Sequence, residues 1–122
     1  MDGKLEISRL YDFYGALIPE SQQQVVELYV NDDLSLSEVA DILSISRQGV
    51  RDSLNRAMKK LRAFEERLGL MAAYDRRRAV AEAIARDARA VISISGDSGI
   101  VRLCESILAH AEQLEDNNTD ID

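Results

Sequence analysis

The sequence of residues 33–61 is DLSLSEVADILSISRQGVRDSLNRAMKKL. Ser35 lies three residues before Glu38, which is the spacing of a capping box, where a hydroxyl and a carboxylate bind free backbone N–H groups at the start of a helix. This spacing predicts a helix that begins near Leu36. The apolar residues of its buried face are Val39, Ala40 and Leu43.

A second helix is expected to follow after a turn at residues 44–45. Ser46 is placed to cap it, and apolar residues then recur at three- and four-residue steps. These residues are Val50, Leu54, Ala57, Met58 and Leu61. Two helices joined by so short a turn are typical of a helix-turn-helix, which places its second helix in the major groove of DNA.

The exposed side of this second helix carries the candidate binding residues. Arginine, glutamine and asparagine are suited to guanine, adenine and phosphate, whereas Asp52 would repel phosphate and could accept a hydrogen bond from cytosine. The candidate DNA-binding residues are Arg47, Gln48, Arg51, Asn55, Arg56 and Lys59.

The charge of the chain is unevenly distributed. The formal net charge of -7 argues against a protein that coats nucleic acid without sequence preference. Residues 1–45 hold two basic and nine acidic side chains, whereas residues 46–68 hold seven basic and three acidic ones. Residues 69–122 are again net acidic. The basic charge therefore collects on the predicted recognition helix, although an ordinary solvated helix face could carry the same charges.

The composition favours an all-α protein. The chain has 122 residues, one Pro, six Gly and long stretches of Ala, Leu, Glu and Arg. No apolar run approaches the roughly 20 residues that span a bilayer, and no secretory signal is visible at the N-terminus. Cys104 is the single cysteine, which fits a reducing compartment. We therefore expect a cytoplasmic protein without membrane insertion.

We expect a helix-turn-helix domain over residues 1–69. Amphipathic helices are predicted over residues 7–17 and 20–30, separated at Pro19, which cannot continue a helix but suits the start of one. The apolar pattern of the recognition helix continues to Leu68, and Gly69 is a plausible helix end. A helix this long projects beyond a small core and needs a partner, either later in the chain or on another chain.

Residues 70–122 are expected to form a helical hairpin that acts as a dimerisation or partner-binding extension, with an acidic tail from residue 115. Its first helix, over residues 73–92, should bury Val80, Ala83, Ile84, Ala88 and Val91. Its second, capped by Asp97 or Ser98, should bury Ile100, Leu103, Cys104, Ile107, Leu108, Ala111 and Leu114. The candidate partner-binding residues are Arg76, Arg77 and Arg78. We expect a homodimer, because helix-turn-helix proteins usually bind DNA as two-fold symmetric dimers that contact two half-sites.

We expect no enzyme, cofactor, metal or small-molecule substrate. The segment at residues 96–99, GDSG, resembles the surroundings of a serine nucleophile, but it is more simply a turn followed by a helix cap. Cys104 and His110 are too few ligands for zinc. No glycine-rich phosphate loop is present, and Asp32 and Asp33 are accounted for by a turn.

These motifs together resemble the C-terminal helix-turn-helix of sigma factors and, more fully, the YlxM family of small bacterial sigma-like proteins. The matching segments, over about residues 7–70, are Asp12-Phe13-Tyr14-Gly15, Leu28-Tyr29, Asp32-Asp33-Leu34-Ser35-Leu36, Ser46-Arg47-Gln48, Val50, Asp52, Arg56 and Glu65-Glu66-Arg67-Leu68. The resemblance implies a DNA-binding regulator. It also implies a link to the signal recognition particle, because genes of the family tend to accompany those of the particle and its receptor. The alternative is an accessory protein that binds the particle's protein or RNA without reading DNA.

Overall fold

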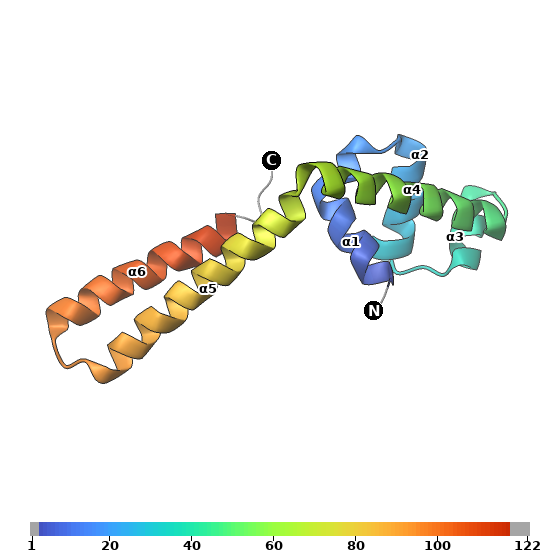
Figure 1. Cartoon of the computed structure of the whole chain (residues 1–122). Helices are drawn as coiled ribbons and strands as arrows, with labels where there is room; N and C mark the ends of the chain where they lie inside the picture. Colours follow the sequence, from blue (N-terminus) through green and yellow to red (C-terminus); the bar gives the residue numbers. More distant parts are fainter. Residues whose placement is uncertain (1–2, 118–122) are drawn as a thin grey trace. The chain divides into compact units, whose positions relative to one another are not determined.

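The computed structural model describes residues 3–117, and over this range the chain is built from helices and connecting turns (Figure 1). The predicted all-α class is therefore confirmed. The chain divides into two compact units, Met1–Met71 and Ala72–Asp122. The first holds the helix-turn-helix, and the second holds a helical hairpin.

Two helices precede the helix-turn-helix, as predicted, with different bounds. Helix α1 spans Gly3–Tyr14 and is followed by the 3-10 turn η1, Gly15–Leu17. Helix α2 spans Glu20–Val26 and widens into the π-helical segment η2, Glu27–Asn31. The close approach at Gly15 requires glycine, because a Cβ there would lie 2.7 Å from the ring of Tyr11.

The helix-turn-helix comprises α3, Leu36–Leu43, and α4, Arg47–Leu68. The capping box is confirmed: the Glu38 N–H donates to the Ser35 hydroxyl at 3.1 Å, and the Ser35 N–H donates to the Glu38 carboxylate at 2.9 Å. Ser44 turns the chain with a φ of 56°, in the left-handed region. The Ser46 hydroxyl then accepts from the Gly49 N–H at 2.9 Å and caps α4.

The core of the first unit lies under α4, which packs on α1, α2 and α3. Helix α4 therefore presents one side to the core and leaves the other exposed. Its buried residues are Val50, Leu54, Ala57 and Leu61. They meet Ile7, Leu10, Tyr14, Ile18, Val25, Val26, Val39 and Ala40. Gly69, with a φ of 63°, ends α4 as predicted.

The second unit is the hairpin of α5, Leu70–Ile94, whose first two residues belong to the first unit, and α6, Ser98–Asn117. The two helices lie side by side (Figure 1). Asp97 caps α6, because its carboxylate accepts from the N–H groups of Gly99 at 2.8 Å and Ile100 at 3.1 Å. The GDSG segment is thus a turn and a cap. Of the predicted acidic tail, residues 118–122 lie outside the described residues.

The predicted buried stripe of α5 is confirmed in part. Ala88 is buried, and Ala83 and Val91 are half-buried. Val80 and Ile84 are exposed, and Tyr74, Ala81 and Ala85 are buried in their place. On α6, Cys104 and Ala111 are buried as expected. The large residues predicted beside them are exposed, namely Ile100, Leu103, Ile107 and Leu114. The hairpin closes on its small residues because these let two helices approach closely.

Between residues 3 and 117, no helix has the length and apolar character that a membrane span requires.

Candidate nucleic-acid interface

The exposed side of α4 begins at the Ser46 cap. Arg47, Arg51 and Asn55 follow one another at intervals of four residues, which aligns them along one side of the helix. Helical periodicity places Gln48 and Lys59 beside this row, on the side farthest from the buried residues. All five side chains are exposed. Five of the six candidate residues therefore form one continuous surface.

Arg56 lies at the edge of this surface. It follows Arg51 by five residues, which turns it roughly 140° from Arg51 around the helix axis, but it precedes Lys59 by three residues and lies beside that side chain. Arg56 is also exposed, so it is available for a phosphate beside the main row.

Gln48 is held by its neighbour one turn along the helix. Its side-chain N–H donates to the Asp52 carboxylate at 2.9 Å. The bond orients the Gln48 amide, and the carboxylate keeps its negative charge because the amide is neutral. Asp52, which the sequence marked as unfavourable for phosphate, is therefore the hydrogen-bond partner of the Gln48 side chain.

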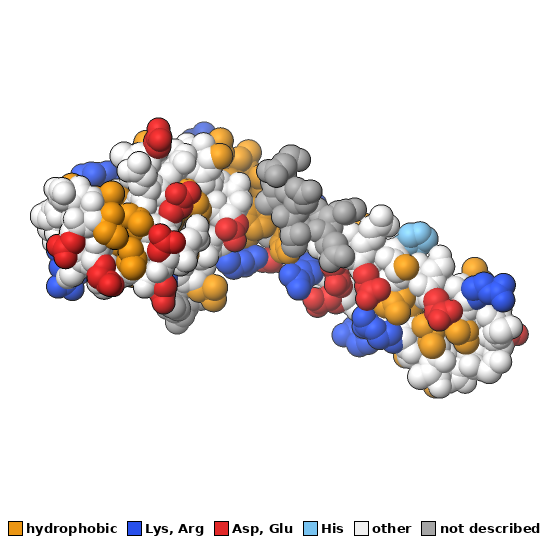
Figure 2. All heavy atoms as spheres, turned by 180° about the vertical axis from the view of Figure 1, so that it is seen from behind, with side chains coloured by type: hydrophobic (Ala, Val, Ile, Leu, Met, Phe, Trp, Pro, Cys, Tyr) orange, Lys and Arg blue, Asp and Glu red, His pale blue; other side chains and the backbone are white. Residues whose placement is uncertain are grey.

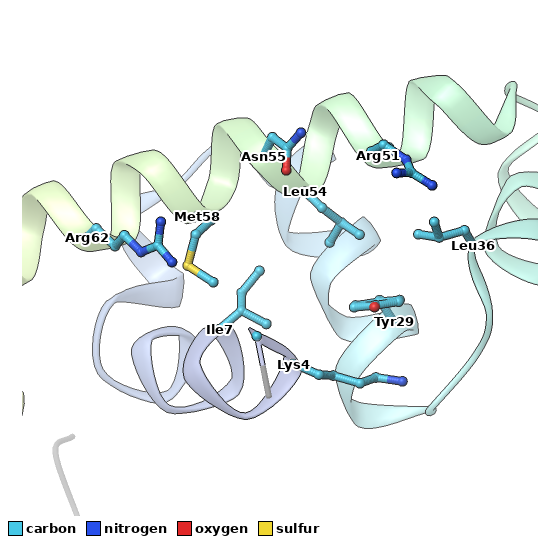
Figure 3. A pocket seen from close by; sticks show the side chains of 10 residues that line it. Lys4, Ile7, Tyr29, Leu36, Arg51, Leu54, Asn55, Met58 and Arg62 are labelled. Carbon is cyan, nitrogen blue, oxygen red and sulfur yellow. The ribbon is translucent and has the colours of Figure 1, made fainter. Parts of the chain in front are cut away.

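A hollow of about 430 Å³ lies beside the Arg47–Asn55 row, between α4, α1 and η2. Figure 3 shows Arg51, Leu54 and Met58 on the side of α4 that faces this hollow. The opposite wall is formed by Lys4, Ile7 and Tyr29. Lys4 is a cation near the candidate surface that the sequence analysis missed. Lys4 lies 47 residues before Arg51 in the chain, and the two come together only in the folded protein. No local sequence pattern therefore indicates that Lys4 lies near the candidate surface.

Two ion pairs fix the cations around the hollow. The Lys4 ammonium lies 2.6 Å from the Asp33 carboxylate and 4.4 Å from the centre of the Tyr29 ring. Hydrogen bonding to Lys4 lowers the pKa of Asp33. Arg62 donates two hydrogen bonds to Glu6, at 2.7 and 3.1 Å, which lower the pKa of the Glu6 carboxyl and join α4 to α1.

The candidate partner-binding arginines lie at the start of the hairpin. Arg76, Arg77 and Arg78 are all exposed. Arg78 donates to the Tyr74 hydroxyl at 3.2 Å and pairs with Glu82 at 3.3 Å, and these contacts raise its pKa. Arg76 and Arg77 border a hollow of about 250 Å³ together with Val80, Ala81 and Leu114.

No three His, Cys, Asp or Glu side chains between residues 3 and 117 gather closely enough to hold a metal ion. Cys104 is a free, buried thiol in the hairpin.

Comparison with known proteins identifies the family. Residues 1–94 match the family UPF0122, described as "Putative helix-turn-helix protein, YlxM / p13 like". The chain belongs to the UPF0122 family. The match includes the whole helix-turn-helix and the first helix of the hairpin, so the resemblance to the YlxM family is confirmed.

UPF0122 relatives occur in several bacteria. A UPF0122 protein of Thermoanaerobacter sp. (strain X514) is 37% identical over 113 residues, which cover 93% of this chain and 97% of that protein. One of Caldanaerobacter subterraneus subsp. tengcongensis is 50% identical over 70 residues, or 57% of this chain and 60% of that protein. One of Clostridium perfringens (strain SM101 / Type A) is 43% identical over 82 residues, which cover 67% of this chain and 73% of that protein.

Proposed function

We propose that this UPF0122 protein is a regulator that binds duplex DNA through the exposed surface of α4. The supporting observation is the arrangement of that helix: it is capped at Ser46 and anchored by buried residues on one side. At the same time it presents Arg47, Gln48 and Arg51 on the other. A rigid helix with such side chains at its N-terminal end is what major-groove recognition requires. A cytoplasmic location goes with this proposal.

The basic charge of α4 supports the proposal in spite of the acidic chain. Long-range attraction falls off within about 10 Å at moderate salt, so the local charge governs contact with phosphate. Distant acidic residues then weaken binding without preventing it. We expect moderate affinity and strong salt dependence.

Fluorescence anisotropy with a labelled pool of random-sequence 30-base-pair duplexes tests the proposal. Arg47→Ala and Arg51→Ala should each weaken binding by roughly tenfold and reduce the slope of log affinity against log salt by about one. Arg86→Ala is the matched control, because Arg86 is an exposed arginine of the hairpin. Undiminished binding by both α4 variants would reject the interface.

The second candidate is an accessory of the signal recognition particle, which would bind its protein or RNA. Its support is the exposed Arg76 and Arg77 beside an apolar hollow, a combination suited to an acidic partner with apolar side chains. Co-purification of the particle with the wild-type chain, abolished by alanine at both positions and unaffected by Arg51→Ala, would favour this function over DNA binding.

We further propose that the protein acts as a homodimer. A helix-turn-helix unit of this size contacts one half-site, and two-fold symmetry doubles the contacts with DNA. Sedimentation at micromolar concentration tests this expectation, and a monomer under those conditions would contradict it.

A further inference from the structure

The hairpin packs in an unusual way for a two-helix unit. The buried residues of the hairpin are mostly small, namely Ala81, Ala85 and Ala88 on α5 and Cys104 and Ala111 on α6, and Tyr74 is the one large residue among them. Burial of apolar surface grows with side-chain size, so the larger residues are those expected inside. Here most of them lie outside, and the hairpin alone does not cover them.

The exposed large residues form one face across both helices, which we call the outer face. On α6 they recur at three-, four- and seven-residue intervals, and on α5 they occupy one flank of the alanine row. Val80 and Leu114 line the same hollow, which shows that the two flanks meet on one side of the hairpin. The residues of the outer face are Val80, Ile84, Ile94, Ile100, Leu103, Ile107 and Leu114.

Their exposure is substantial. Val80 is 60% exposed, Leu103 68% and Ile94 83%. Figure 2 shows hydrophobic side chains among charged ones on the visible surface of the hairpin. A fully buried aliphatic side chain removes about 100 Å² of apolar surface, so seven that are about half exposed offer roughly 400 Å². This is within the size of the largest patch on an ordinary monomer, which is often a functional surface.

That area suffices for a dimer. Homodimer interfaces are about 65% apolar, so an apolar contribution of this size corresponds to roughly 600 Å² per copy. Two copies then bury roughly 1,200 Å², at the lower limit of stable specific interfaces.

The outer face also has complementary features that a second copy would match. The most exposed side chains, Ile94 and Leu103, lie near the turn of the hairpin, whereas the hollow lined by Val80 and Leu114 lies at its open end. A two-fold axis that places two hairpins antiparallel brings each turn against the open end of the other hairpin. The same contact then forms twice, as an isologous interface requires.

Charge favours the antiparallel orientation. Arg76 and Arg77 border the Val80–Leu114 hollow at the open end of each hairpin, whereas Arg78 is paired with Glu82. A parallel arrangement would bring the Arg76 and Arg77 side chains of the two copies together, and like charges in contact are destabilising. The antiparallel arrangement separates them by the length of the hairpin.

We propose that two copies of this chain dimerise through the outer faces of their hairpins, with Leu103 of each copy entering the Val80–Leu114 hollow of the other. The inference rests on the homodimer of the proposed function and gives that dimer its contact surface. None of the residues in this contact belongs to the α4 surface proposed for DNA.

Sedimentation velocity of the full chain between roughly 1 and 100 µM tests the proposal, because interfaces near the lower size limit are typical of weaker associations. The wild type should shift from monomer to dimer, and Leu103→Glu should remain a monomer at the highest concentration. Ala109→Glu is the matched control, because Ala109 is exposed on the opposite side of α6 and should still dimerise. A wild-type monomer throughout, or an unchanged dimer of Leu103→Glu, would overturn the proposal.

A cross-linking experiment tests the orientation in a Cys104→Ala background. Chains with Leu103→Cys should cross-link under mild oxidation to chains with Val80→Cys when the two are mixed. Preferential cross-linking of Leu103→Cys chains to one another would overturn the antiparallel arrangement. DNA binding tests the proposed function separately, because Arg47 and Arg51 lie outside the hairpin. If the wild-type chain binds no DNA, or if Arg47→Ala and Arg51→Ala both bind it normally, the DNA-binding proposal fails and the dimer proposal is unaffected.

Discussion

The buried Tyr14 hydroxyl donates a hydrogen bond to the Glu65 carboxylate, 51 residues further along the chain. The same pair caps the start of α5. The Leu70 N–H donates to the Tyr14 oxygen at 3.0 Å, and the Met71 N–H donates to Glu65 at 2.9 Å. Tyr14 thus satisfies one backbone N–H at the beginning of α5, and Glu65, to which it is hydrogen-bonded, satisfies the next.

Tyr14→Phe should destabilise the first unit by about 1–2 kcal/mol, because it leaves the Leu70 N–H and the Glu65 carboxylate without this partner. Urea unfolding followed by circular dichroism measures the loss. Tyr11→Phe is the control: the Tyr11 hydroxyl donates to the exposed Glu27 at 2.9 Å, where water can replace it. Equal losses in the two variants would contradict the role assigned to Tyr14.

The stability of the first unit should fall between pH 10 and 12. Burial and the hydrogen bond to Glu27 raise the pKa of Tyr11 from 10.0 to about 12, and burial also raises the pKa of Tyr14. The folded chain therefore keeps protons that the unfolded chain has released in this window, so rising pH favours unfolding. Tyr11→Phe should flatten the decline in free energy of unfolding, and a decline unchanged by that substitution would refute the assignment.

Ser35→Ala should cost about 1 kcal/mol, because it removes the hydroxyl that accepts from the Glu38 N–H at the start of α3. Ser37→Ala, an exposed site within the same first turn, serves as the control and should have little effect. Thermal unfolding distinguishes the two, and a loss at Ser37 as large as at Ser35 would argue against the cap.

Ser44→Gly should stabilise the chain by about 1 kcal/mol. Ser44 adopts a φ of 56°, a left-handed conformation that costs residues with a Cβ and that glycine adopts readily. Ser44→Ala keeps the Cβ and should give no gain. If both variants unfold at the same denaturant concentration, backbone strain at this turn is not the cause of any change.

Asp52→Asn should strengthen binding to random duplex DNA several-fold if α4 is the interface. The substitution removes a negative charge near the phosphates and retains an oxygen that can accept from Gln48. Anisotropy titrations at two salt concentrations measure the change, which should be larger at low salt. Asp87→Asn, on the exposed surface of α5, should leave binding unchanged.

The helix-turn-helix was predictable from sequence because local chemistry marks its boundaries. The capping box of Ser35 and Glu38 starts α3, Ser46 caps the start of α4, and Gly69 ends α4. Each of these residues acts on backbone groups only a few residues away, so a short stretch of sequence reveals it. The single core also helps, because an apolar stripe on α4 has only one direction in which to be buried. The candidate DNA-binding residues consequently lie along one exposed side of α4, with Arg56 at its edge, as expected of residues chosen from one helix face.

The hairpin was harder to predict because its apolar surface is wide. On α5, Val80 and Ala81 are adjacent in sequence and both apolar, and periodicity alone does not show which of them faces α6. Ala81 is the one that is buried, because its small side chain lets the two helices approach closely. Contacts such as Lys4 with Asp33 and Tyr14 with Glu65 join distant segments, and they leave no local trace in the sequence.

The small buried residues of the hairpin also include the one thiol of the chain. Cys104 is buried between α5 and α6, and a thiol reagent reaches it only when the two helices separate. The rate of Cys104 labelling under native conditions therefore reports how often the hairpin opens. The protein carries its own reporter of local unfolding, without any engineered label.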